Sequence, residues 1–169
     1  PGAQNSIFDD TPDLTPPAIV NVVVSNTTTL LISLSEPLDE NGLSGATIEL
    51  AQGIAVSNFA LIESDTIQVS LASPLETGVV YVLSVTGMTD CEGNSSSLET
   101  TEILIGELPL PGDIVISEIM ADPTPAVGLP EGEYFELFNK SSKTLEIQGS
   151  DLSGVVFEES VILLPGQYL

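Results

Sequence analysis

The chain has 169 residues, 25 acidic and 2 basic side chains, no histidine and a formal net charge of −23. A chain without a basic face binds neither the phosphate backbone of nucleic acids nor an anionic membrane surface. The lack of histidine and the single cysteine exclude Ser-His-Asp triads, Cys-His dyads, histidine-ligated zinc and an internal disulfide. Hydrophobic residues make up 42% of the chain, so we expect a folded protein despite the charge. No apolar run is long enough for a transmembrane helix, so no membrane insertion is expected.

Residues 1–17 contain four prolines and three aspartates and show no hydrophobic periodicity. This composition predicts an acidic, proline-rich linker. The sequence begins with Pro1, which we interpret as a processed or excised segment of a longer chain.

Residues 18–108 are predicted to consist of strands. Polar and apolar residues alternate with a period of two, and turn clusters rich in Gly, Asn and Asp separate the runs. Strands are predicted at 18–25, 30–35, 66–71 and 80–86, within a set of about seven. Such a set in about 90 residues favours an immunoglobulin-type β-sandwich. Leu75-x-x-Gly78-x-x-Tyr81 has the spacing of a tyrosine corner, whereas the chain has no Trp and too few Cys for an antibody domain.

Residues 109–112, Pro-Leu-Pro-Gly, predict a short stiff joint, after which a second β domain covers 113–169. Too few residues remain there for a complete sandwich of about 100 residues, so we expect a domain that is truncated, shortened or completed by another chain. The predicted fold class is all-β, an Ig-like β-sandwich followed by a second, partial Ig-like β-sandwich. The strands expected in the second domain are 113–120, 134–139, 144–147, 152–157, 161–164 and one starting near Gln167.

The acidic turn Asp90-Cys91-Glu92-Gly93-Asn94 is the best candidate for cation chemistry. Calcium prefers six to eight oxygen ligands from carboxylates, amides and backbone carbonyls, and this turn brings several together. Asp13 and Asp10 in the linker could join Asp90 and Asn94 at a domain junction. The alternative is an Asx-type turn in which Asp90 and Asn94 bond only to nearby backbone. Both interpretations stay open, with calcium as the only cofactor considered.

The other polar groups favour structural roles. Glu118 and Glu136 are the carboxylates that a glycosidase would need, but their place in predicted strands favours structural hydrogen bonds. The acidic, proline-rich stretch at 122–133 is interpreted as a rigid connection between strands, with a binding loop or a second cation site as the alternatives. Acidic neighbours disfavour the thiolate of Cys91, which we expect to be partly buried and inert. The sequence therefore predicts no enzyme.

Two resemblances to known families cover most of the chain. About residues 13–105 resemble the Ig-like repeats of bacterial surface-layer and large adhesin proteins. About residues 112–169 resemble the bacterial lamin-tail domain. The motifs of the first resemblance are Asp13-x-x-Pro16-Pro17, Leu34-Ser35-Glu36-Pro37-Leu38, Leu75-x-x-Gly78-x-x-Tyr81 and Thr89-Asp90-x-x-Gly93-Asn94. Those of the second are Gly112 to Pro123, Glu133 to Ser142, Leu152-Ser153-Gly154 and Leu164-Pro165-Gly166-Gln167-Tyr168-Leu169.

These resemblances imply an extracellular or cell-surface setting, in long proteins of Gram-negative bacteria that are often secreted by the type IX route. They imply a non-catalytic structural or adhesive module, a spacer or assembly unit that calcium could stiffen. The alternative is an accessory region of a secreted hydrolase or nuclease whose catalytic domain lies outside this segment. A carbohydrate-binding module is disfavoured because the chain has no Trp and only three Tyr. The expected partners are neighbouring domains of the same chain, other surface proteins, or a chain that pairs with an exposed strand edge.

Overall fold

The computed structural model describes residues 12–122, 132–152 and 154–169, and every regular element among them is a β-strand. No helix in these ranges is long and apolar enough to cross a membrane. The chain divides into two compact units. Unit 1 comprises Pro1–Pro74 and Tyr81–Ile103, and unit 2 comprises Leu75–Val80 and Leu104–Leu169.

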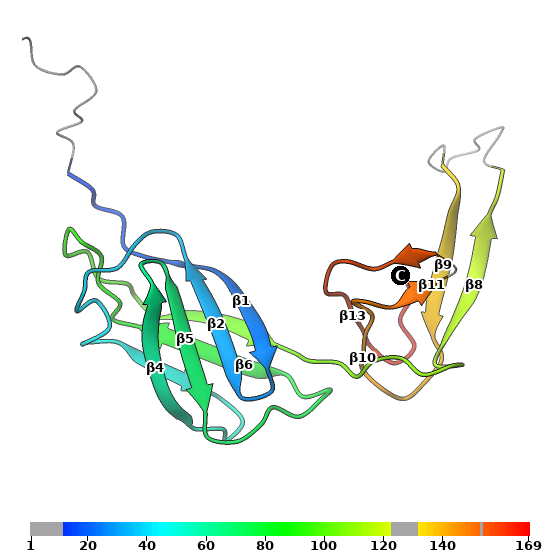
Figure 1. The fold of residues 1–169 in the computed structure, drawn as a ribbon, viewed down its shortest axis with the longest axis horizontal. Coiled ribbons are helices and arrows are strands. Elements are labelled where there is room, and N and C mark those ends of the chain that lie inside the picture. Colours follow the sequence, from blue (N-terminus) through cyan, green and yellow to red (C-terminus); the bar gives the residue numbers. More distant parts are fainter. Residues whose placement is uncertain (1–11, 123–131, 153) are drawn as a thin grey trace, which may run out of the picture. The chain divides into compact units, whose positions relative to one another are not determined.

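The described residues of unit 1 form a seven-stranded antiparallel sandwich (Figure 1). One sheet has the strand order β1-β2-β5-β4 and the other has the order β3-β6-β7. This is the strand order of a constant-type immunoglobulin domain, so the predicted all-β, Ig-like sandwich is confirmed. The strands are β1 (Ile19–Asn26), β2 (Thr29–Leu34), β3 (Thr47–Leu50), β4 (Val56–Glu63), β5 (Thr66–Leu71), β6 (Tyr81–Thr86) and β7 (Glu99–Ile103).

The alternating residues of unit 1 form its core. In β2, β5 and β6 every second residue is buried, and Leu30 pairs in register with Val69 of the neighbouring strand. Tyr81 is the first residue of β6 and only 3% exposed, which is the position of a tyrosine corner. The alternation predicted for these three strands is therefore confirmed.

Strand β4 was not predicted individually, because its apolar residues do not alternate with a period of two. Its register against β5 shifts twice, between Val56 and Asn58 and between Leu61 and Glu63. Each β-bulge inserts one extra residue and moves the following side chains to the other face. The sequence pattern of a bulged strand is consequently irregular even though β4 pairs with β5 from Val56 to Glu63.

Unit 2 combines one hairpin of longer strands with several strands of only two residues. Strand β8 (Ile114–Met120) pairs with β9 (Tyr134–Asn139), and Tyr168 bridges Phe138 on the other side of β9. Strand β10 (Leu145–Glu146) pairs with β13 (Ile162–Leu163). The single strand predicted at 152–157 is wrong. That stretch instead contains β11 (Asp151–Leu152) and β12 (Val155–Val156), which form a hairpin. The chain reverses near Gly154, which has the positive φ of +94° that glycine adopts without strain.

The segment before the proline-rich joint packs within unit 2. Glu107 lies parallel to Leu145, its backbone N–H donates to the Thr144 carbonyl, and its own carbonyl accepts from Glu146. A Cβ atom at Gly106 would overlap the backbone of Leu145, so this close approach requires glycine. Residues 104–108, assigned to the first domain in the sequence analysis, thus pack with the second group of strands.

Candidate functional site

Three carboxylates meet at one end of unit 1. One oxygen each of Asp13, Glu36 and Asp90 lies within 4.8 Å of the others. Asp13 precedes β1, Glu36 lies in the β2–β3 loop and Asp90 lies in the β6–β7 loop. Asp13 is exposed, Glu36 is half-buried and Asp90 is 1% exposed. We call these three residues the carboxylate cluster.

Backbone contacts between the two loops hold the carboxylate cluster together. Leu38 forms an antiparallel bridge with Asp90, and Thr89 donates its N–H to the Gly42 carbonyl at 2.9 Å. A Cβ atom at Gly42 would overlap the Thr89 carbonyl oxygen, so only glycine allows this approach. The fold thereby brings Glu36 and Asp90 together, although 53 residues of chain separate them.

Asp90 already has hydrogen-bond donors at both carboxylate oxygens. Its Oδ1 accepts from the backbone N–H of Glu92 at 2.9 Å and of Asn94 at 2.7 Å, and its Oδ2 accepts from Asn94 Nδ2 at 2.7 Å. Burial alone raises the pKa of Asp90, but these hydrogen bonds outweigh it and the pKa lies below its usual value. The carboxylate thus stays ionised inside the turn.

Glu36 is in the opposite electrostatic situation. Desolvation raises the pKa of Glu36 above its usual value, and the negative charges of Asp13, Asp90 and Glu92 raise it further. No lysine or arginine occurs in the first 108 residues to balance these charges. A cation between the carboxylates would relieve this repulsion, as would a proton on Glu36.

The structure brings together some of the predicted cation ligands. Asp13 and Asp90 both belong to the carboxylate cluster. Asn94 lies beside them, but its Nδ2 group faces them and donates to Asp90 and to the Asp13 carbonyl, so its amide oxygen points elsewhere. Asp10 lies outside the described residues.

Glu36 was not among the cation ligands predicted from the sequence. The available signal was its place in the Leu34-Ser35-Glu36-Pro37-Leu38 motif, directly after a predicted strand. Only the pairing between the β2–β3 and β6–β7 loops places this side chain opposite Asp90.

Cys91 lies next to the carboxylate cluster and is exposed, so its expected partial burial is wrong. Loop residues on the solvent side of a turn need no packing partner. Desolvation and then the charges of Glu92, Asp39, Asp90 and Glu36 raise the pKa of the Cys91 thiol. The thiol therefore stays protonated at neutral pH and is a poor nucleophile.

Glu118 and Glu136 are direct register partners on β8 and β9. Tyr134 Oη donates to Glu118 Oε1 at 2.8 Å, and Ser117 Oγ donates to Glu136 Oε1 at 2.6 Å. The bond to Glu118 raises the pKa of Tyr134. These exposed cross-strand bonds fit the structural role expected for the two carboxylates. The predicted loop at 122–133 lies largely outside the described residues.

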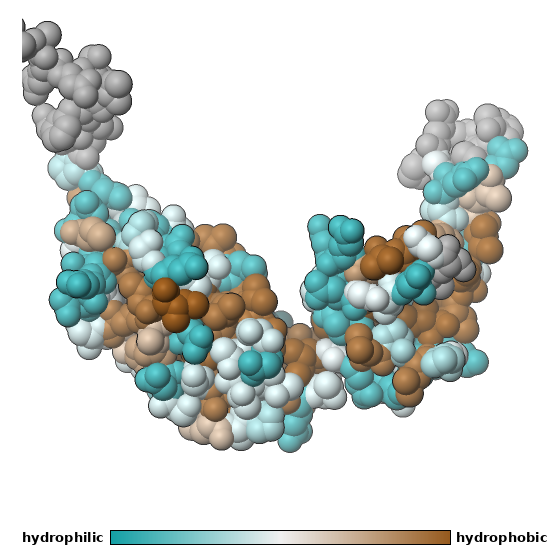
Figure 2. Space-filling model, viewed as in Figure 1, coloured by the Kyte–Doolittle hydropathy of each residue, from teal (hydrophilic) through white to brown (hydrophobic). Residues whose placement is uncertain are grey.

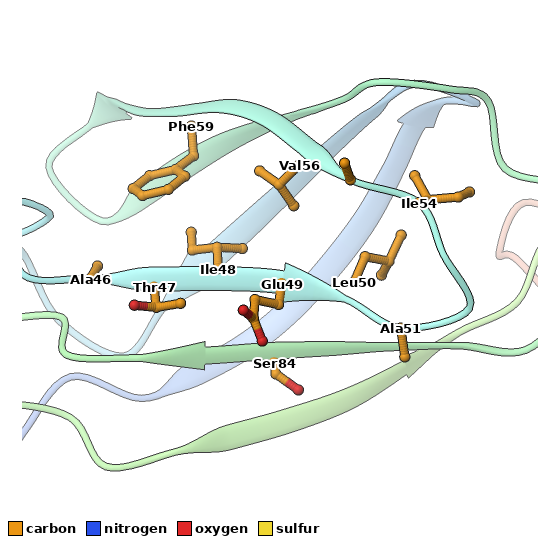
Figure 3. Close-up of a pocket in the computed structure, with 11 residues that line it drawn as sticks. Ala46, Thr47, Ile48, Glu49, Leu50, Ala51, Ile54, Val56, Phe59 and Ser84 are labelled. Atoms are coloured by element: carbon orange, nitrogen blue, oxygen red, sulfur yellow. The ribbon is translucent and has the colours of Figure 1, made fainter.

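A lateral groove of about 550 Å³ opens between the edge strands β3 and β4 of unit 1 (Figure 3). Ile48, Leu50 and Ile54 are buried at its base, and Phe59 and Val56 extend into it from β4. Glu49 and Ser84 point away from these apolar side chains. Both edges are blunted, since β3 has only four residues and β4 carries two bulges.

Comparisons with known proteins yield structural neighbours alone. No protein-family model and no curated protein matches this chain. Among solved structures, domains 1–6 of the surface layer protein SbsC are 21% identical, with a TM-score of 0.48 over 62% of this chain and 15% of that one. The N-terminal part of the bacterial S-layer protein SbsC is 20% identical, with a TM-score of 0.45 over 60% of this chain and 26% of that one. This chain therefore spans only a small part of the length of these neighbours.

Proposed function

We propose that this chain is a non-catalytic structural module of a longer, secreted or cell-surface bacterial protein, in which unit 1 acts as a spacer. The observation that carries the proposal is the path of the chain through unit 1. The chain enters beside the carboxylate cluster, where the start of β1 pairs with the end of β2. It leaves at the end of β7, where Ile103 pairs with Tyr81 at the opposite end of β6 (Figure 1).

A unit that the chain enters at one end and finally leaves at the opposite end lengthens a protein by its own long dimension. Modules connected in this way can be repeated in series without folding back on one another. The acidic surface supports the same role, because a net charge of −23 keeps such modules soluble and apart. Asp90 is bound into a turn and Glu118 into a cross-strand pair, which are structural arrangements.

The location is tested on intact cells of the source bacterium. The full-length protein carries an epitope tag beside this segment, and a tagged cytoplasmic protein serves as the control. We expect an antibody to label the tag before permeabilisation and the control only afterwards. Labelling of both proteins only after permeabilisation would contradict a cell-surface module.

The accessory-region alternative is tested on the purified full-length protein with and without residues 1–169. Hydrolase or nuclease activity that resides elsewhere in the protein and survives the deletion would favour the alternative. A full-length protein without such activity, in which the deletion shortens the particle seen by electron microscopy, favours the spacer.

We also propose that the carboxylate cluster binds calcium and stiffens the end of unit 1. Asp13, Glu36 and Asp90 would supply carboxylate oxygens, and the charge crowding on Glu36 favours a cation there. The competing interpretation is a self-contained Asx turn. It is supported by the hydrogen bonds that both carboxylate oxygens of Asp90 already accept.

Thermal unfolding separates the two interpretations. At a calcium concentration of about 100 times Kd, a site restricted to the native state adds about 2.7 kcal/mol, which raises Tm by about 10 °C or more over the EDTA value. Magnesium at matched ionic strength should give a much smaller shift. Glu36→Gln should abolish the calcium shift, while the matched control Glu40→Gln, an exposed residue of the same loop, should keep it. Equal Tm values in EDTA and calcium would contradict calcium binding, and only the Asx-turn interpretation would remain.

A further inference from the structure

A second groove, of about 370 Å³, follows the free edge of β8 in unit 2. Three consecutive residues, Ile114, Val115 and Ile116, line it. Leu137, the β9 partner of Ile116, also lines it, so the groove covers the face of the hairpin that carries Ile116 and reaches the free edge of β8 at Val115. Ile147, Asp151 and Phe157 are among the residues that complete the lining. Among the described residues, β8 pairs with β9 alone.

The hydrogen bonds of β9 show which backbone groups of β8 face this groove. Leu137 exchanges both backbone hydrogen bonds with Leu169, at 2.8 and 2.9 Å, so its N–H and carbonyl point away from β8. Its register partner Ile116 is therefore in a non-hydrogen-bonded pair, and the N–H and carbonyl of Ile116 point away from β9. Asn139, whose N–H donates to the Gln167 carbonyl, gives the same result for its partner Ile114.

Apolar side chains accompany these unpaired backbone groups. Ile114 and Ile116 share the face of the hairpin that carries Leu137, which is 3% exposed. After the bulge at Ser117 the same face continues with Ile119, which is 67% exposed, and its partner Phe135, which is 38% exposed. Figure 2 shows apolar surface gathered over this part of unit 2. An edge with this pattern offers both a hydrogen-bonding template and sites for alternate apolar side chains.

The charges around the groove select the partner. Asp151 lines the groove, and Glu118 lies further along β8 on the opposite face of the hairpin, where it pairs with Glu136. Lys143 is engaged by Asp113, with its Nζ 3.2 Å from Oδ2. A second copy of this chain would add another formal net charge of −23, so charge complementarity favours a basic partner over self-association.

We propose that the free edge of β8 binds an extended segment of another protein, which adds as a strand and alternates β-branched apolar residues with polar ones between flanking lysines or arginines. Its backbone pairs with Ile114 and Ile116, its apolar side chains cover Ile147 and Phe157, and its basic ends lie near Asp151 and Glu118. The inference does not depend on the spacer role of unit 1.

The test uses two capped peptides, Lys-Thr-Val-Thr-Ile-Thr-Val-Lys and the same sequence with Glu at both ends. Each is titrated to 1 mM into the ¹⁵N-labelled chain in EDTA at low salt. We expect the lysine peptide to shift the amide signals of residues 113–117 and 150–157 and to protect the Ile114 and Ile116 N–H groups from exchange. The glutamate peptide should bind at least tenfold more weakly, and added salt should reduce this difference.

Two pairs of variants distinguish strand addition at the β8 edge from nonspecific peptide binding. Ile116→Pro removes the N–H that faces the groove and leaves the pairing with β9 intact, because an edge position tolerates proline. It should weaken binding about tenfold, whereas the control Ile116→Val should bind as the parent does. Asp151→Asn keeps an acceptor for the Gly154 N–H and should weaken lysine-peptide binding about two- to fivefold. Glu102→Gln on β7 of unit 1 is its control and should change nothing.

Each of the following results would overturn the proposal. The first is no binding at 1 mM, and the second is equal binding of both peptides. The third is unchanged affinity in Ile116→Pro while β9 amides keep their protection. Self-association in sedimentation velocity that Ile116→Pro abolishes would assign the edge to a second copy instead.

Discussion

Unit 1 encloses its apolar side chains, whereas unit 2 leaves most of its own on the surface. Fifteen of the twenty buried apolar residues found in the described ranges belong to unit 1. Conversely, twelve of the seventeen large apolar residues that are exposed in the same ranges belong to unit 2. The strands of both units are rich in apolar residues, so composition alone does not distinguish a closed core from an open one.

The difference follows from strand length and sheet order. Unit 1 packs a four-stranded sheet on a three-stranded sheet, so each alternating face finds an apolar partner. Of the six strands in the described part of unit 2, four have only two residues, too few to cover the hairpin of β8 and β9.

Asn139, which is 0% exposed, partly compensates for the small core of unit 2. Its Nδ2 donates to the carbonyls of Lys143 and Leu163, and its Oδ1 accepts from the N–H and hydroxyl of Ser141. Hydrogen bonds of one buried amide therefore hold segments of unit 2 together, whereas apolar packing holds the strands of unit 1 together.

The largest expected effect tests the closed core. Leu83 on β6 is 0% exposed, so Leu83→Ala should destabilise unit 1 by about 2–5 kcal/mol through lost burial and a residual cavity. Ile119→Ala, at a position 67% exposed, should change the stability of unit 2 by no more than about 0.5 kcal/mol. Urea unfolding followed by resolved NMR signals of each unit measures both. Similar losses at the two positions would mean that the units do not differ as described.

The next effect tests the polar centre of unit 2. Asn139→Ala leaves buried carbonyls without a donor and should cost about 1–3 kcal/mol. Asn139→Asp should cost more, because a buried carboxylate cannot donate to Lys143 and Leu163 carbonyls. We expect the NMR signals of unit 2 to lose dispersion while those of unit 1 stay unchanged. Native-like unit 2 signals in Asn139→Asp would show that the hydrogen bonds of Asn139 do not stabilise unit 2.

A smaller effect is expected at the acidic end of unit 1, where the stability change caused by a Glu36 substitution should depend on pH. A pKa of Glu36 above its ordinary value of 4.5 means that the stability it contributes is present at lower pH and lost as pH rises through the folded-state pKa. In EDTA, Glu36→Gln should therefore be more stable than the parent at pH 7 and about equal to it at pH 4. Urea midpoints at both pH values measure the difference, with Glu40→Gln as the control. A variant less stable than the parent at pH 7 would contradict the crowding of charges.

The smallest expected effect concerns the two lysines. Lys143 Nζ lies 3.2 Å from Asp113 Oδ2 and 4.0 Å from Glu107 Oε2. The Leu110 N–H and then this lysine lower the pKa of Asp113. Lys143→Gln should lower the Tm of unit 2 by a few degrees at most, less in high salt, and the exposed Lys140→Gln should lower it less still. The same Tm change in both variants would assign the effect to net charge rather than to this contact.

The alternating residues predicted the strands that have one buried face. Leu30 and Ile67, in strands predicted at 30–35 and 66–71, lie in the core, because a period of two is a local property of a half-buried strand. The irregular β4 escaped prediction because its bulges are set by pairing with β5. The alternation of residues likewise did not indicate the turn at Gly154, which divides the strand predicted at 152–157.

In the candidate site, too, some features follow from the local sequence and others depend on contacts between distant segments. Oxygen ligands in the turn at Asp90 follow from the local sequence, as does the absence of basic side chains around them. The approach of Glu36 depends on the close contact of Gly42 with Thr89, which no spacing in the sequence encodes. The free edge of β8 likewise depends on which side of β9 the residues near Leu169 occupy. Sequence thus determined strand periodicity, charge and the excluded chemistries, because these are properties of neighbouring residues. Tertiary structure decided which carboxylates meet and which edge stays open, because those depend on pairing between distant segments.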